Sequence, residues 1–143
     1  MSEPSTRPQD VIARLTELRS EITGRNAHAK EQLRGLQQRA GALHQNAPSR
    51  QADVATADFC QTVVDWLQEN VDWMSAVVVW LNGQWWLFGA QSWAINEITS
   101  DITTIQGWQR WVQANCALVD IIYDIVVAVE AIIAFVEWVI SLF

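Results

Sequence analysis

The chain has 143 residues, a length that fits one domain around one hydrophobic core. It is 50% hydrophobic and 17% charged, with a formal net charge of −7. Because an acidic chain repels phosphate backbones, this composition speaks against nucleic acid as a partner.

Charge and tryptophan are divided unequally along the chain. Residues 1–53 contain eight Lys or Arg, six Asp or Glu and no Trp, whereas residues 54–143 contain one base, ten acids and all nine Trp. A polar, proline-containing stretch around Pro48 separates the two parts. The sequence therefore predicts a polar helical arm (1–48), a linker (49–57) and a Trp-rich acidic hydrophobic region (58–143).

Compartment and cysteine chemistry are judged from two local features. The N-terminal residues contain no apolar segment behind a basic stretch, so we expect no secretory signal peptide and a protein that is cytoplasmic or associated with the cytoplasmic side of a membrane. Cys60 and Cys116 lack the Cys-x-x-Cys spacing and are flanked by apolar residues. We expect them to be small buried hydrophobic residues without a disulfide.

The first predicted element is a long amphipathic helix that starts after Pro8, with Asp10 as its cap. Its apolar residues recur at a seven-residue spacing as Leu15, Ile22, Ala29, Leu36 and Leu43. Acidic and basic side chains alternate over the rest of its surface. This pattern is typical of a coiled coil or of one arm of a helical bundle.

The second predicted element is a helix that starts near Asp53 or Thr56 and ends near Leu81, with an aromatic row at Phe59, Trp66, Trp73 and Trp80. Asn82-Gly83 follows it. Within residues 77–88 this pair fits either a type I′ β-hairpin or a tight turn between antiparallel helices. The helical turn is favoured because the tryptophan spacing continues up to it.

Downstream, Trp86 and Trp93 repeat the spacing, and Ser100–Gly107 contains residues that break or cap a helix, with a cap near Asp101. From Trp108 to Phe143 four of seven helical rows are apolar. A helix this apolar must be enclosed on several sides. We therefore predict an all-α fold: a coiled-coil-like N-terminal helix, a Trp-rich helical hairpin and a long apolar C-terminal helix in an oligomeric bundle.

Membrane contact is an alternative to enclosure by protein. Residues 125–143 are long enough to span a bilayer, but the cost of burying Glu130 and Glu137 nearly cancels the gain from the apolar side chains, so a lone span stays undecided. In an oligomer both glutamates could face a shared interior or lumen and avoid lipid. The predicted assembly or membrane face comprises Trp66, Trp73, Trp80, Trp86, Trp93, Trp111, Leu118, Ile125, Ile132 and Val139. The candidate lumen-facing or pH-sensitive acids are Asp120, Asp124, Glu130 and Glu137.

Catalytic and metal-binding patterns are not recognisable in the sequence. His28 and His44 have no ligand partners at metal spacing, and there is no phosphate loop or nucleophile elbow. We therefore expect no catalytic residue, no metal and no cofactor.

The expected function is that of a non-enzymatic scaffold or membrane-anchoring subunit that self-assembles through its hydrophobic C-terminal helices. The expected partners are further copies of the chain, a larger protein complex and a membrane in contact with the C-terminal half. The alternative is a small pore-forming or membrane-perturbing effector, whose hairpin and last helix insert on contact with lipid or acid.

Overall fold

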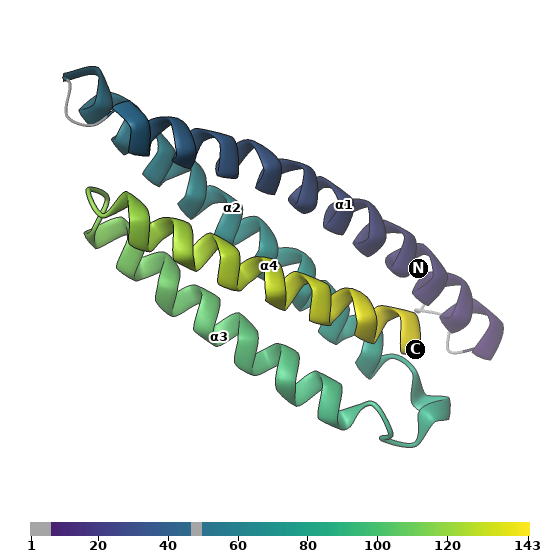
Figure 1. The fold of residues 1–143 in the computed structure, drawn as a ribbon. Helices are drawn as coiled ribbons and strands as arrows, with labels where there is room; N and C mark the ends of the chain where they lie inside the picture. Colours follow the sequence, from purple (N-terminus) through teal and green to yellow (C-terminus); the bar gives the residue numbers. More distant parts are fainter. Residues whose placement is uncertain (1–6, 47–49) are drawn as a thin grey trace, which may run out of the picture.

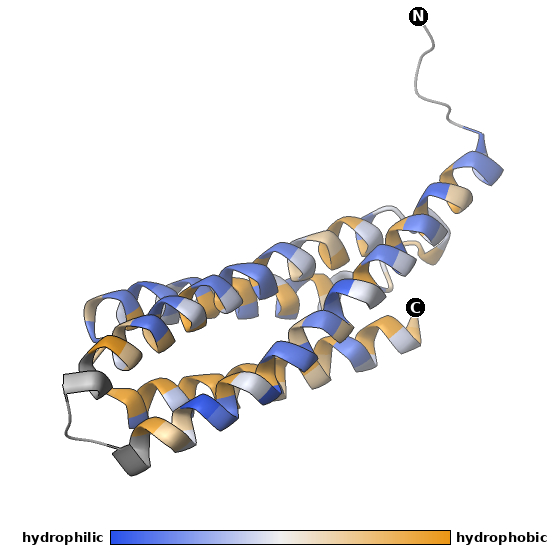
Figure 2. Cartoon of the chain, turned by 90° about the horizontal axis from the view of Figure 1, so that it is seen from above, coloured by the Kyte–Doolittle hydropathy of each residue, from blue (hydrophilic) through white to orange (hydrophobic). Residues whose placement is uncertain are grey.

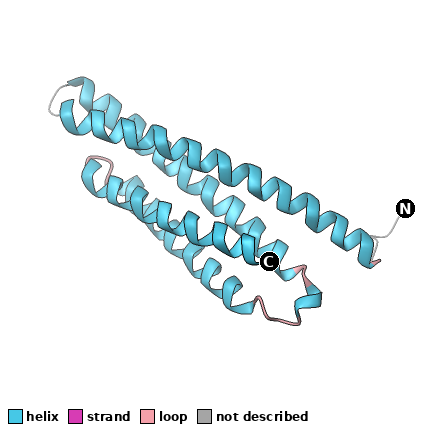
Figure 3. Cartoon of the chain, turned by 45° about the vertical axis from the view of Figure 1, so that its right-hand side comes forward, coloured by secondary structure: helices cyan, strands magenta, loops and turns pink. Residues whose placement is uncertain are grey.

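A computed structural model describes residues 7–46 and 50–143 as helices joined by short connections (Figure 1). No strand occurs in these two ranges (Figure 3). The all-α prediction is confirmed, and the β-hairpin alternative at residues 77–88 is wrong. The elements are α1 (Pro8–Asn46), α2 (Arg50–Asn82), the 3₁₀ helix η1 (Trp85–Leu87), α3 (Ser92–Ala114) and α4 (Val119–Leu142).

The four long helices run up and down beside one another, and α2 contacts all three others (Figure 1). The pairs α1–α2 and α2–α3 share the most extensive contacts, whereas α4 packs more sparsely on α1, α2 and α3. One continuous hydrophobic core therefore joins the N-terminal helix to the tryptophan-rich part of the chain.

The apolar row of α1 faces this core. Ile22, Ala29, Leu36 and Leu43 are buried and Leu15 is half-buried, while the charged faces of α1 remain in solvent. The predicted long amphipathic helix is confirmed, and its partners in this fold are α2 and α4 of the same chain. Coiled-coil pairing with another chain stays a prediction.

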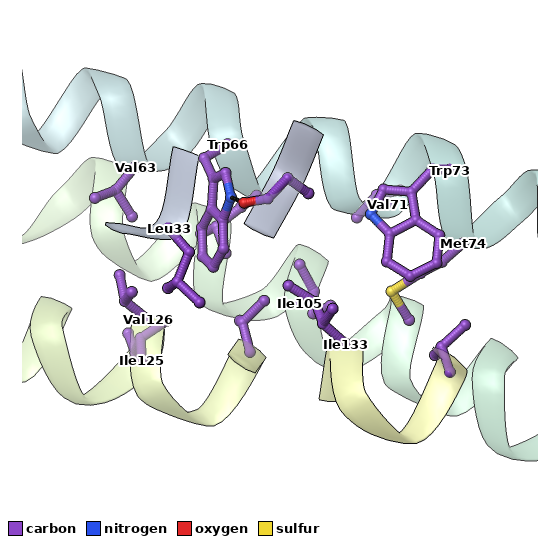
Figure 4. Packing of buried hydrophobic residues seen from close by; sticks show 14 of the residues in the cluster. Leu33, Val63, Trp66, Val71, Trp73, Met74, Ile105, Ile125, Val126 and Ile133 are labelled. Carbon is purple, nitrogen blue, oxygen red and sulfur yellow. Dashed lines mark hydrogen bonds between the residues drawn. The ribbon is translucent and has the colours of Figure 1, made fainter. Parts of the chain in front are cut away.

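The aromatic row of α2 forms the centre of the core. Phe59, Trp66 and Trp73 are fully or almost fully buried. Figure 4 shows the rings of Trp66 and Trp73 among aliphatic side chains of α3 and α4, such as Ile105 and Ile133. Because one face of α2 carries these rings and the opposite face carries carboxylates, the other helices pack around a single side of α2.

The start of α2 differs from the prediction. The helix begins at Arg50 rather than near Asp53 or Thr56, so residues 50–57, expected to be linker, are helical. Pro48 lies outside the described residues. The division into an arm and a hydrophobic region stays a prediction, although α1 shares the core of the other helices.

The break expected at Ser100–Gly107 is also wrong, because α3 runs without interruption from Ser92 to Ala114. Thr103 and Thr104 donate their hydroxyl hydrogen bonds to the carbonyls of Thr99 and Ser100, one turn earlier. Hydroxyl side chains satisfied in this way are tolerated inside a helix. The real break lies at residues 115–118, where the apolar rows continue in phase and hide it.

A disulfide joins Cys60 on α2 to Cys116 in the α3–α4 turn, with the Cα atoms 5.3 Å apart. The expectation of two unpaired buried cysteines is therefore wrong. Sequence spacing gave no hint of the pair, because the residues are 56 positions apart and meet only when the end of α3 lies against the first half of α2.

Candidate functional site

Half of the predicted assembly or membrane face lies inside the chain's own core. Trp66, Trp73, Trp80, Ile125 and Val139 are all buried. In this fold they cannot contact a second molecule, because α1 and α3 supply the enclosure that one small chain was expected to lack. Trp111 and Ile132 are half-buried, and Trp86, Trp93 and Leu118 remain exposed.

The buried tryptophans have hydrogen-bond partners for their indole N–H groups. Trp66 Nε1 donates to the carbonyl of Ala29 at 2.9 Å, and Trp73 Nε1 donates to Asn70 Oδ1 at 2.9 Å. The Asn70 amide in turn donates to the carbonyl of Trp66 at 2.8 Å. Burial of a polar group costs little free energy when the group is hydrogen-bonded. The burial of Trp66, Trp73 and Asn70 is therefore explained by their part in the core.

The side of α4 that points away from the core is apolar over most of its length. Trp138 and Leu142 on this side are 51% and 50% exposed. After Asp124 no charged residue occurs on it. We call it the outer face of α4, and its residues are Val127, Ala128, Ala131, Ala134, Phe135, Trp138 and Leu142.

Within the described residues, α4 is the one helix that is long and apolar enough to cross a membrane, and 33% of its most apolar stretch is buried. Figure 2 shows it mainly in the hydrophobic colour, in contrast to α1. Length and composition of this kind are also found in core helices of proteins that never enter a bilayer. The distinguishing feature of α4 is thus its uncovered outer face.

A second exposed apolar surface lies at the end of the bundle, in the connection between α2 and α3. Phe88 is 92% exposed and Trp85 is 57% exposed, with Trp86 beside them. We call Trp85, Trp86 and Phe88 the aromatic tip. Of these three residues, only Trp86 was predicted as part of the assembly or membrane face. The absence of charge after Asn82-Gly83 was the signal that could have identified Trp85 and Phe88.

The aromatic tip and the outer face of α4 approach each other. Trp93, at the start of α3, lies with its ring centroid 5.9 Å from that of Trp138 and 6.3 Å from that of Phe143. Trp86 and Phe143 line a common hollow of about 150 Å³. The two surfaces therefore meet where α4 ends.

The acids of α4 do not gather around a lumen within this chain. Lys30 Nζ donates to Glu137 Oε1 at 2.7 Å, and Gln37 Nε2 donates to Glu130 Oε2 at 3.2 Å. These groups line a hollow of about 480 Å³ between α1 and α4, together with charges of both signs from α1. Asp120 lies beside Gln37 in a neighbouring hollow, and Asp124 is exposed.

One carboxyl group in the described residues has a pKa that departs from its ordinary value. Burial raises the pKa of Asp101 above its ordinary value of 3.8, and the nearby Glu97 carboxylate raises it further. Among the described residues no group of three or more His, Cys, Asp or Glu is placed to hold a metal ion.

Within the described residues, the outer face of α4 and the aromatic tip are thus apolar surfaces that packing within the chain leaves uncovered. Large contiguous apolar surfaces that stay exposed are typical of contact sites for protein or lipid. Comparison with family models, with curated proteins and with solved structures finds no match for this chain.

Proposed function

We propose that this protein is a non-enzymatic structural subunit that self-assembles, and that the outer face of α4 is covered by a second copy. The observation that carries the proposal is the exposure of Val127, Trp138 and Leu142 on a side of α4 without charge after Asp124. Covering such a surface with protein removes apolar area from water, which is the main driving force of association.

The sizes of the side chains on this face favour an identical partner. Small residues occupy its first part, at Ala128, Ala131 and Ala134, and large residues occupy its second part, at Phe135 and Trp138. Two copies of α4 in antiparallel orientation would place large residues against small ones in both directions. Interdigitation of this kind gives the close packing that helix pairs require.

Charge favours the same orientation. Asp120 and Asp124 both lie near the start of α4. A parallel pair would bring the two carboxylates of one copy next to the two of the other. An antiparallel pair separates the carboxylates of the two copies by most of the helix length, which is about 36 Å. Since like charges in proximity destabilise an interface, the antiparallel pair is preferred.

The test is the mass of the purified full chain, measured by light scattering during size exclusion. The wild type is expected at a multiple of the chain mass of 16.2 kDa, and Ala131→Glu at the mass of one chain with unchanged helical circular dichroism. The matched control is Ala42→Glu, which replaces an exposed alanine on α1 and should keep the wild-type mass. Ile125 is unsuitable for this test because it is buried in the chain's own core.

An unchanged mass in Ala131→Glu would contradict the proposal, as would a wild type that is a single chain in solution. A single chain that releases dye from vesicles would instead favour the pore-forming alternative. In that case α4 leaves the bundle, and the contacts of Glu137 with Lys30 and of Glu130 with Gln37 are broken.

A further inference from the structure

Beyond self-assembly, we propose that the aromatic tip is a peripheral docking site for a lipid surface with uncharged or zwitterionic headgroups. In this arrangement Trp85, Trp86 and Phe88 enter the interfacial region of the bilayer, and the helices stay outside it. The tip belongs to the α2–α3 connection and not to the outer face of α4, so the two proposals concern different residues.

Phe88 combines an exposed side chain with a backbone conformation that is rare for a bulky residue. Its side chain is 92% exposed, and its backbone lies in the left-handed region with φ of 51°. A bulky residue rarely adopts this region; here it ends η1, where the Phe88 N–H donates to the Trp85 carbonyl, while the exposed ring gains no packing inside the chain. Strain of this sort is retained most often where a side chain serves a contact outside the fold.

The backbone of the connection between α2 and α3 is largely hydrogen-bonded within itself. Amide N–H groups of residues 83, 84, 85, 87, 88, 90 and 92 all donate to carbonyls between residues 79 and 89. The Gln91 side chain donates to the carbonyls of Leu81 and Gln84. A segment enters a lipid interface more readily when its polar backbone groups are already paired, and most N–H groups of this connection are paired in this way.

The aromatic tip lies in an uncharged stretch of the chain. No charged residue occurs between Asp72 and Glu97. The ten residues from Asp72 to Asn82 span about 15 Å of helix, so shallow entry of the tip keeps the Asp72 carboxylate outside the hydrocarbon. The start of α1 lies at the same end of the bundle (Figure 1) and is nearly balanced in charge, with Arg7, Asp10, Arg14, Glu17 and Arg19. Attraction to anionic headgroups is therefore not expected.

The apolar area of the aromatic tip is small. An aromatic side chain buries about 150–250 Å², so three partly covered rings bury less than the roughly 800 Å² per partner of a stable protein interface. A bilayer sets no such threshold, since its interface accepts individual Trp and Phe rings. The tip is thus large enough for lipid docking and too small for a stable protein complex of its own.

The experiment is flotation of the full chain with phosphatidylcholine vesicles. Wild type is expected to float, whereas the double variant Trp85→Gln/Phe88→Asn should partition at least about tenfold less. Asn tolerates the left-handed backbone at position 88, so the variant should fold, as circular dichroism would verify. The control is Val54→Asn, which replaces an exposed apolar residue of α2 far from the tip and should float as the wild type does.

Three outcomes would overturn the proposal: a wild type that does not float, a double variant that floats equally, or binding that appears only with phosphatidylserine and is lost in salt. The last would assign binding to the bases of α1. Light scattering of the same variant without vesicles separates this proposal from self-assembly. A double variant of lower mass would show that the tip contacts protein, whereas unchanged mass with lost flotation supports lipid docking alone.

Discussion

Two groups of aromatic residues differ in their surroundings, one inside the bundle and one at its end. Trp66 and Trp73 are buried, and each donates its indole N–H to a defined acceptor, the Ala29 carbonyl or the Asn70 side chain. Trp85 and Phe88 have the same apolar character but remain in solvent. Residue type alone therefore does not determine whether an aromatic side chain belongs to the core; the helices that pack over it do.

The buried group is covered because α1 and α3 both pack on α2, with α4 completing the core. The exposed group lies beyond Gly83, where the helix has ended. A Cβ atom at Gly83 would approach Leu15 Cδ2 to 2.7 Å. The glycine thus lets α1 pack closely against the end of α2 while the following residues turn away from the core.

The largest expected effect is the loss of stability on truncating a buried ring, compared with truncating an exposed one. Trp66→Ala should lower the free energy of unfolding by about 3–5 kcal/mol, because it leaves a cavity and removes the donor to Ala29. Trp85→Ala should change it by no more than about 0.5 kcal/mol, as is usual for exposed positions. Urea unfolding followed by circular dichroism measures both, and equal losses would break the comparison between inside and end.

The next effect concerns the disulfide at the opposite end of the bundle. Cys60→Ala/Cys116→Ala should lower the free energy of unfolding by about 2–4 kcal/mol, because the bond restricts the unfolded chain. Urea unfolding measures this loss, and a thiol titration of the unreduced wild type should detect no free cysteine. Flotation of the variant with vesicles should not change, since the aromatic tip is distant from the bond. Free thiols in the unreduced protein would contradict the pairing.

The smallest effect is a dependence on pH. Because burial and Glu97 raise the pKa of folded Asp101 above 3.8, its ionisation opposes folding. The stabilising contribution of the protonated form is complete below the unfolded pKa and is lost as the pH rises through the folded value. Asp101→Asn should therefore raise the melting temperature slightly at pH 7, and the difference should vanish below pH 3.8. A lower melting temperature at pH 7 would show that the Asp101 carboxylate is stabilised instead.

The sequence was sufficient for much of the fold. The seven-residue row of α1 and the aromatic row of α2 are local patterns that depend only on helical geometry, and both correspond to buried faces. The end of α2 near Asn82-Gly83 was also predictable, because the glycine and the following aromatics interrupt that geometry.

Other features depend on distant parts of the chain and could not be read locally. The break at residues 115–118 was hidden because Trp111 and Leu118 keep the helical spacing across it. Pairing of Cys60 with Cys116 requires the three-dimensional approach of α2 and the α3–α4 turn. For the candidate surfaces, the sequence indicated excess apolar area but not which rows the chain itself would cover.

The bond between Cys60 and Cys116 also changes the topology of the chain. It closes a covalent ring that holds most of α2, the aromatic tip and the whole of α3, and it leaves α1 and α4 outside the ring as two tails. α4 begins at Val119, three residues from the ring, so its first turn is anchored close to a fixed point. Detachment of either tail would leave α2 covalently joined to α3, and a single backbone cut at the tip would leave the two pieces of the chain joined.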